Sequence, residues 1–73
     1  MKNYILILDT STRELRRLRE LLTGEGYDIM TASELETALL ILAKVPVSLI
    51  LCEPVFLKGV LDTKKKFPIR KKK

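Results

Sequence analysis

The chain contains no histidine and no tryptophan, and its one cysteine is Cys52. The absence of histidine excludes histidine-based triads, histidine metal sites and phosphohistidine chemistry within this chain. A single cysteine cannot form an internal disulfide, which is typical of a protein in a reducing compartment. The longest uninterrupted apolar run, Ala38–Ala43, is far shorter than the ~18 residues that a membrane-spanning helix needs. We therefore expect a cytoplasmic protein without a membrane segment.

The remaining composition is that of one small globular domain. The chain has 73 residues, of which 47% are hydrophobic and 32% are charged. Residues 1–57 carry six basic and eight acidic side chains, a net charge of −2, whereas residues 58–73 carry eight basic and one acidic side chain, a net charge of +7. The excess of positive charge therefore belongs to the C-terminal segment. We expect a folded unit over residues 1–57, followed by a third helix and a basic tail over residues 58–73.

Three short apolar segments rich in β-forming residues are predicted to be strands, namely Tyr4–Leu8, Tyr27–Thr31 and Leu49–Cys52. Amphipathic helices are predicted between them, and strands that alternate with helices indicate a parallel α/β sheet. Right-handed crossovers then place the strands in the order 2-1-3, with the two connecting helices on opposite faces. In a three-stranded sheet the third segment is an apolar edge, so we expect a homodimer through this strand or an unstable isolated chain.

The helix boundaries are predicted from short polar signals. Ser11 with Glu14, and Ser33 with Glu36, each have the spacing of a capping box, in which the two residues satisfy each other's backbone amides. A third helix is predicted over about 57–66, and residues 70–73 are expected to be a disordered end. Four arginines in the first helix are expected to form a solvated face: Arg13, Arg16, Arg17 and Arg19.

Residues 4–60 resemble the first half of a response-regulator receiver domain, the phosphorylated switch of two-component signalling and phosphorelays. The matching segments follow one another without a gap: Tyr4–Asp9, Glu25–Tyr27, Thr31–Ser33, Ala38–Leu39, Pro46 and Leu49–Glu53. The resemblance implies a flavodoxin-like fold, with a parallel sheet in the order 2-1-3-4-5 and helices on both faces. It also implies a site at the carboxyl ends of the first and third strands. This chain is therefore expected to be a partial receiver with a three-stranded sheet in the order 2-1-3.

The residues at the matching site positions depart from the family. In an active receiver an acidic pair and a phosphoacceptor aspartate hold Mg²⁺ during phosphoryl transfer. By position, Asp9 is the first acid, Thr10 replaces the second, and Glu53 replaces the phosphoacceptor. Val55 matches the position whose backbone carbonyl is a further metal ligand. The family's hydroxyl residue on strand 4 and lysine on strand 5 have no counterpart in the chain.

These differences predict a site without catalytic activity. Thr10 lacks a carboxylate ligand, and the longer side chain of Glu53 displaces its carboxylate by more than an ångström, which can cost about 10²-fold in rate. We expect no cofactor, or at most weak Mg²⁺ binding through Asp9, Glu53 and Val55. Asp9 is either a residual metal ligand or an acceptor for amides of the following turn. Glu53 is either a solvated strand end, a permanent charge that mimics a phosphoryl group, or a weakly competent phosphoacceptor together with Asp9.

The resemblance implies a pseudo-receiver that acts as a signal-transduction module through a protein partner of a two-component pathway and is not an enzyme. The alternative is a binder of nucleic acid or of an anionic surface through the basic tail, whose cations are Lys64, Lys65, Lys66, Arg70, Lys71, Lys72 and Lys73. No helix-turn-helix or base-stacking motif accompanies these lysines, which favours a tail without a binding role.

Overall fold

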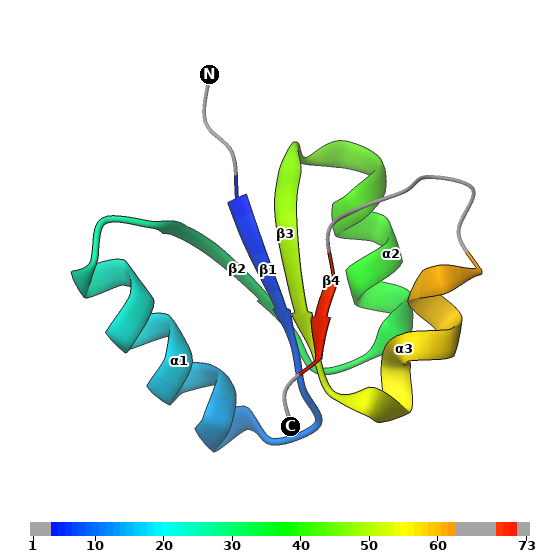
Figure 1. The fold of residues 1–73 in the computed structure, drawn as a ribbon, viewed down its shortest axis with the longest axis horizontal. Helices are drawn as coiled ribbons and strands as arrows, with labels where there is room; N and C mark the ends of the chain where they lie inside the picture. Colours follow the sequence, from blue (N-terminus) through cyan, green and yellow to red (C-terminus); the bar gives the residue numbers. More distant parts are fainter. Residues whose placement is uncertain (1–3, 63–68, 72–73) are drawn as a thin grey trace.

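The computed structural model of the chain describes residues 4–62 in full and the backbone of residues 69–71. In chain order the elements are β1 (Tyr4–Leu8), α1 (Thr12–Gly24), β2 (Asp28–Ala32), α2 (Leu35–Lys44), β3 (Val47–Cys52), α3 (Pro54–Leu61) and β4 (Ile69–Lys71). All strand pairs are parallel, and the order β2-β1-β3 confirms the prediction. Helix α1 lies on one face of the sheet, whereas α2 and α3 lie on the other (Figure 1).

A fourth strand extends the predicted sheet beyond β3. β4 pairs with the second half of β3, with Ile69 opposite Ile50 and Lys71 opposite Cys52. The expectation that β3 is an edge strand is therefore wrong for Ile50–Cys52. The expectation of a disordered end over residues 70–73 is wrong for Arg70 and Lys71. Strands pair through backbone amides and carbonyls, so the added strand needs no apolar pattern. The sequence of the basic tail therefore did not indicate a strand. Dimerisation through this side of the sheet stays a prediction.

The core lies on both faces of the central strand. Because successive side chains of a strand point to opposite faces, Leu6 and Leu8 pack with α2 and α3, whereas Ile5 and Ile7 pack with α1. Cys52 is fully buried on the side of α2 and α3, as expected of a small apolar residue. Burial on both faces explains the continuous apolar sequence of β1.

The start of α1 forms half of the predicted capping box. Ser11 Oγ accepts a hydrogen bond from the backbone amide of Glu14 at 3.2 Å. The reciprocal bond is replaced, because the Ser11 amide donates to Asp9 Oδ1 at 2.9 Å. The Glu14 carboxylate instead accepts from Arg17 Nε at 2.7 Å and forms an ion pair with this arginine. Asp9 therefore helps to fix the turn from which α1 begins.

The other two helices begin where the sequence did not predict. α2 begins at Leu35 after Glu34, which makes no side-chain cap, so the capping box of Ser33 with Glu36 is wrong. α3 begins at Pro54 and ends at Leu61, so it overlaps the predicted helix of about 57–66 but begins and ends several residues earlier. Proline at the first helical position has a suitable φ and lacks an amide that would have no partner there. No helix in the described part of the chain has the length and apolar character needed to cross a bilayer.

Gly59 of α3 lies against Leu35 of α2, where a Cβ atom would overlap the leucine Cδ2 and approach its Cδ1 to 3.1 Å. Gly59→Ala is expected to destabilise the protein by about 1 kcal/mol, because overpacking costs about 1–3 kcal/mol and the gain in helix propensity is about 1 kcal/mol. Gly24→Ala at the end of α1 is the matched control, because nothing lies within 4 Å of its added methyl group. Urea unfolding followed by circular dichroism measures both variants. A Gly59→Ala variant as stable as Gly24→Ala would contradict the close approach of α2 and α3.

Candidate functional site

The carboxyl ends of three strands lie level at one edge of the sheet. In the register of the sheet, Leu8 of β1 lies between Ala32 of β2 and Cys52 of β3. Two backbone hydrogen bonds extend this alignment by one residue: the Asp9 amide donates to the Ala32 carbonyl at 3.1 Å, and the Glu53 amide donates to the Leu8 carbonyl at 3.0 Å. Asp9 and Glu53 therefore leave the sheet at the same edge, as the parallel topology predicted.

Glu53 and Thr10 form a direct contact across this edge. Glu53 Oε1 accepts a hydrogen bond from the Thr10 backbone amide at 2.8 Å and another from Thr10 Oγ1 at 2.9 Å. The two residues are 43 positions apart in the sequence, so the contact ties the turn after β1 to the turn after β3. Hydrogen bonds to an ionised acceptor are stronger than neutral ones, and two of them converge on one oxygen here. The Glu53–Thr10 contact is the defining feature of the candidate site.

Threonine at position 10 is chemically matched to glutamate at position 53. The threonine hydroxyl donates to the glutamate carboxylate, whereas a carboxylate at position 10 would be a like charge beside it. The two residues therefore complement each other: Thr10 supplies a hydroxyl donor, and the side chain of Glu53 reaches it with an acceptor oxygen. The sequence located both residues but did not predict their bond.

Asp9 is buried, with 5% of its surface exposed. Its Oδ1 accepts the Ser11 amide at 2.9 Å, which is the turn-stabilising role that the sequence offered as one alternative. This bond uses one oxygen of the carboxylate to hold the β1–α1 turn. A residual role of Asp9 as a metal ligand stays a prediction.

The geometry gives little support to a metal site. Within residues 4–62 and 69–71, no group of three or more acidic, cysteine or histidine residues is placed to hold a metal ion. Val55, proposed as a carbonyl ligand, is the second residue of α3, and its side chain is 72% exposed. A carbonyl in the first turn of a helix is directed along the axis toward the amide four residues later. The Val55 carbonyl is therefore engaged within α3, and weak Mg²⁺ binding stays a prediction.

Loss of the threonine hydroxyl tests the Glu53–Thr10 contact. Thr10→Val is expected to lower the free energy of unfolding by about 0.5–1.5 kcal/mol, because one hydrogen bond to the carboxylate is removed. Thr10→Ser keeps the hydroxyl and serves as the control, with a smaller loss. Chemical denaturation measures both variants. Equal stability of Thr10→Val and the wild type would show that the side-chain bond contributes nothing.

Only part of the basic tail lies within the described residues. Lys64, Lys65, Lys66, Lys72 and Lys73 lie outside the described residues, and Arg70 and Lys71 are placed only as backbone of β4. The nucleic-acid alternative therefore stays a prediction. Because β4 belongs to the sheet, a deletion of residues 64–73 would remove a strand together with the charges. Neutral substitutions at residues 64–66 are the cleaner test of salt-dependent binding to DNA.

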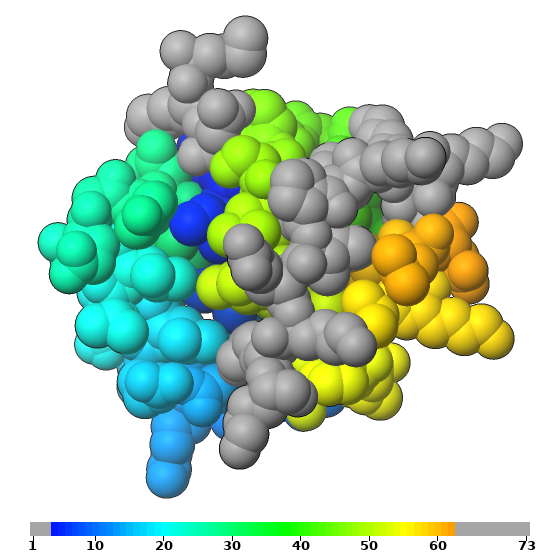
Figure 2. Space-filling view, viewed as in Figure 1, coloured from blue at the N-terminus to red at the C-terminus, as the bar shows by residue number. Residues whose placement is uncertain are grey.

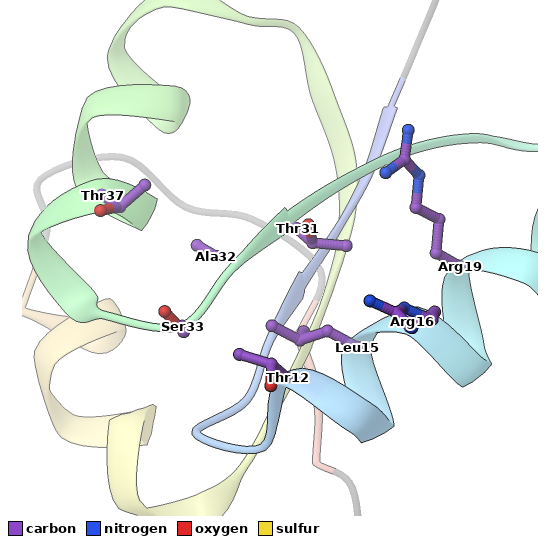
Figure 3. Close-up of a pocket in the computed structure, with 8 residues that line it drawn as sticks. All are labelled: Thr12, Leu15, Arg16, Arg19, Thr31, Ala32, Ser33 and Thr37. Carbon is purple, nitrogen blue, oxygen red and sulfur yellow. The ribbon is translucent and has the colours of Figure 1, made fainter.

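A second group of polar residues was not predicted. Eight residues line an open hollow of about 370 Å³ beside β2: Thr12, Leu15, Arg16, Arg19, Thr31, Ala32, Ser33 and Thr37 (Figure 3). Arg16 and Arg19, expected to be part of a solvated helix face, extend from α1 toward β2. Their spacing of three residues places them on one side of the helix. The sequence does not show that this side borders the hydroxyl residues after β2.

The edge of the sheet thus brings together one buried acid, one hydroxyl and one half-buried carboxylate that is already hydrogen-bonded: Asp9, Thr10 and Glu53. This set can hold two turns in one arrangement, but it lacks the cluster of carboxylates that positions Mg²⁺ for phosphoryl transfer. Comparison with known proteins found no family model that matches the chain, and no similar curated protein or solved structure.

Proposed function

We propose that the chain is a degenerate receiver-like domain that acts as a non-catalytic protein-interaction module in two-component signalling and is not phosphorylated. The observation that carries this proposal is the Glu53–Thr10 contact, because it joins the two strand ends at which a receiver has its phosphorylation site. The parallel order β2-β1-β3, with helices on both faces, is compatible with the same family.

Phosphoryl transfer at this site is disfavoured by two features. The carboxylate that would attack the phosphoryl group already accepts two hydrogen bonds on Oε1, which lowers its nucleophilicity and holds it toward Thr10. No second carboxylate stands at position 10 to help Mg²⁺ neutralise the developing charge. The site therefore keeps the position of a switch without the chemistry that operates it.

The same contact suggests how the module works without phosphorylation. A permanent carboxylate bridges the turns after β1 and β3, so these turns are held in a single arrangement. Such a domain presents one constant surface to a partner, whereas an active receiver alternates between two. A single buried cysteine is consistent with the reducing conditions of the cytoplasm, which we propose as the location of the protein.

Titration of the isotopically labelled chain with phosphotransfer domains of sensor kinases from the same genome tests the proposal. We expect at least one domain to shift a contiguous set of amide resonances in nuclear magnetic resonance spectra, with the same affinity with and without a phosphodonor. The Thr10→Val variant loses one of the hydrogen bonds that hold the turns after β1 and β3 in one arrangement. We therefore expect it to bind the partner more weakly than the wild type. The absence of binding to every phosphotransfer domain would contradict the signalling role.

A further inference from the structure

The hollow beside β2 has a lining with two positive charges and no negative one. Arg16 and Arg19 contribute guanidinium groups, and four hydroxyl side chains complete the polar part of the lining: Thr12, Thr31, Ser33 and Thr37. In Figure 3, Arg16 and Arg19 extend from α1 toward β2, and the side chain of Thr31 points toward α1. The lining residues come from α1, from β2 with the turn after it, and from α2. Three separate elements therefore surround one cationic space.

Neither arginine is engaged by a described acidic residue. Arg17, on the same helix, pairs with Glu14, whereas no ion pair joins Arg16 or Arg19 to an acid within residues 4–62. Glu20 lines a neighbouring hollow of about 490 Å³ together with the same two arginines, Thr23 and Gly24, but it is not part of the lining of the hollow beside β2. The guanidinium donors of Arg16 and Arg19 are thus available to a ligand.

We propose that this hollow binds a small phosphate monoester. Two guanidinium groups offer ten N–H donors in planar forks that match phosphate oxygens, and hydroxyl groups supply further donors in other directions. Buried Leu15 and Ala32 form the apolar part of the lining, where the ester's organic group packs. The inference does not depend on the proposed signalling role.

The size of the hollow favours a monoester over a bare phosphate ion. Its volume of about 370 Å³ lies within the range of about 300–1,000 Å³ of small-molecule sites. The same space would hold roughly a dozen waters at about 30 Å³ each, so a single phosphate ion fills only a small part of it. A phosphorylated sugar is a ligand of suitable size.

Binding of ribose 5-phosphate to the full chain at constant ionic strength tests the proposal. We expect saturable shifts of the amide resonances of Thr12, Thr31 and Ser33, no binding of ribose, and weaker binding of inorganic phosphate. An Arg16→Gln/Arg19→Gln variant is expected to bind at least about tenfold more weakly, because two charge-assisted contacts are lost. Glutamine is a good helix former, so α1 is retained, and thermal unfolding checks this.

The matched control is Arg13→Gln/Arg17→Gln, which removes the same charge from the same helix at positions outside the hollow. Its affinity is expected to stay within about twofold of the wild type. If both double variants bound ribose 5-phosphate equally weakly, the attraction would be a general effect of positive charge on the helix. This result would overturn the site. The absence of saturable binding would overturn it as well. Inorganic phosphate binding as tightly as ribose 5-phosphate would overturn the monoester as the ligand.

Discussion

Replacement of Leu6 by alanine is expected to leave much of the protein unfolded at room temperature. Leu6 lies in the middle of the central strand, and none of its surface is exposed. A buried Leu→Ala substitution costs about 2–5 kcal/mol, through lost transfer energy and the cavity that remains. A core in a chain of this size rarely supplies more than about 3–5 kcal/mol of net stability. The loss is therefore comparable to the whole stability of the domain.

Leu40→Ala is the matched control for this prediction. The chemical change is the same, but Leu40 lies on α2 with 59% of its surface exposed. Its expected loss is below about 1 kcal/mol, in part because alanine is the better helix former. Urea titration followed by circular dichroism compares the two variants. Equal midpoints would contradict the position of β1 at the centre of the sheet.

Introduction of aspartate at positions 10 and 53 of the candidate site is expected to create Mg²⁺-dependent stability. In the Thr10→Asp/Glu53→Asp variant, three carboxylates end at the same edge of the sheet, because Asp9 already lies there. Without metal these like charges repel, and the Glu53–Thr10 contact is lost, so the variant is less stable than the wild type. Mg²⁺ offsets the repulsion and adds about 1.4 kcal/mol at a tenfold excess over its Kd, a rise in Tm of several degrees.

The Thr10→Asn/Glu53→Gln variant separates charge from shape in this experiment. It also removes the bond between hydroxyl and carboxylate, but it adds no negative charge and is expected to show no response to Mg²⁺. Thermal unfolding with and without millimolar Mg²⁺ measures all three proteins. A wild type that gains as much stability from Mg²⁺ as the Thr10→Asp/Glu53→Asp variant would show that threonine at position 10 is no obstacle to metal binding.

The centre of the fold could be predicted because its signals are local and strong. β1 is apolar from Ile5 to Leu8 because these residues are buried, and a continuous apolar run of this kind is readily recognised in the sequence. The parallel topology then brings Asp9 and Glu53 to one edge without any knowledge of side-chain contacts. The start of α1 was equally local, because a hydroxyl three residues before an amide suffices for a cap.

The parts that could not be predicted depend on tertiary placement. β4 pairs through backbone groups in a charge-rich segment, so no pattern of apolar side chains marked it. The start of α3 was set by Pro54, which also signals the end of a strand, and the sequence does not decide between these roles. The Glu53–Thr10 contact depends on a rotamer, and the hollow lined by Arg16 and Arg19 depends on how α1 lies against β2.

Incubation of the wild-type chain with a small phosphodonor and Mg²⁺, followed by intact mass measurement, tests the central claim most directly. A competent receiver treated in the same way shows that the conditions support transfer. The account predicts that this chain keeps its unmodified mass, because Glu53 is held by Thr10 and no second acid positions the metal. A mass increase of one phosphoryl group, located at Glu53 or Asp9, would contradict it.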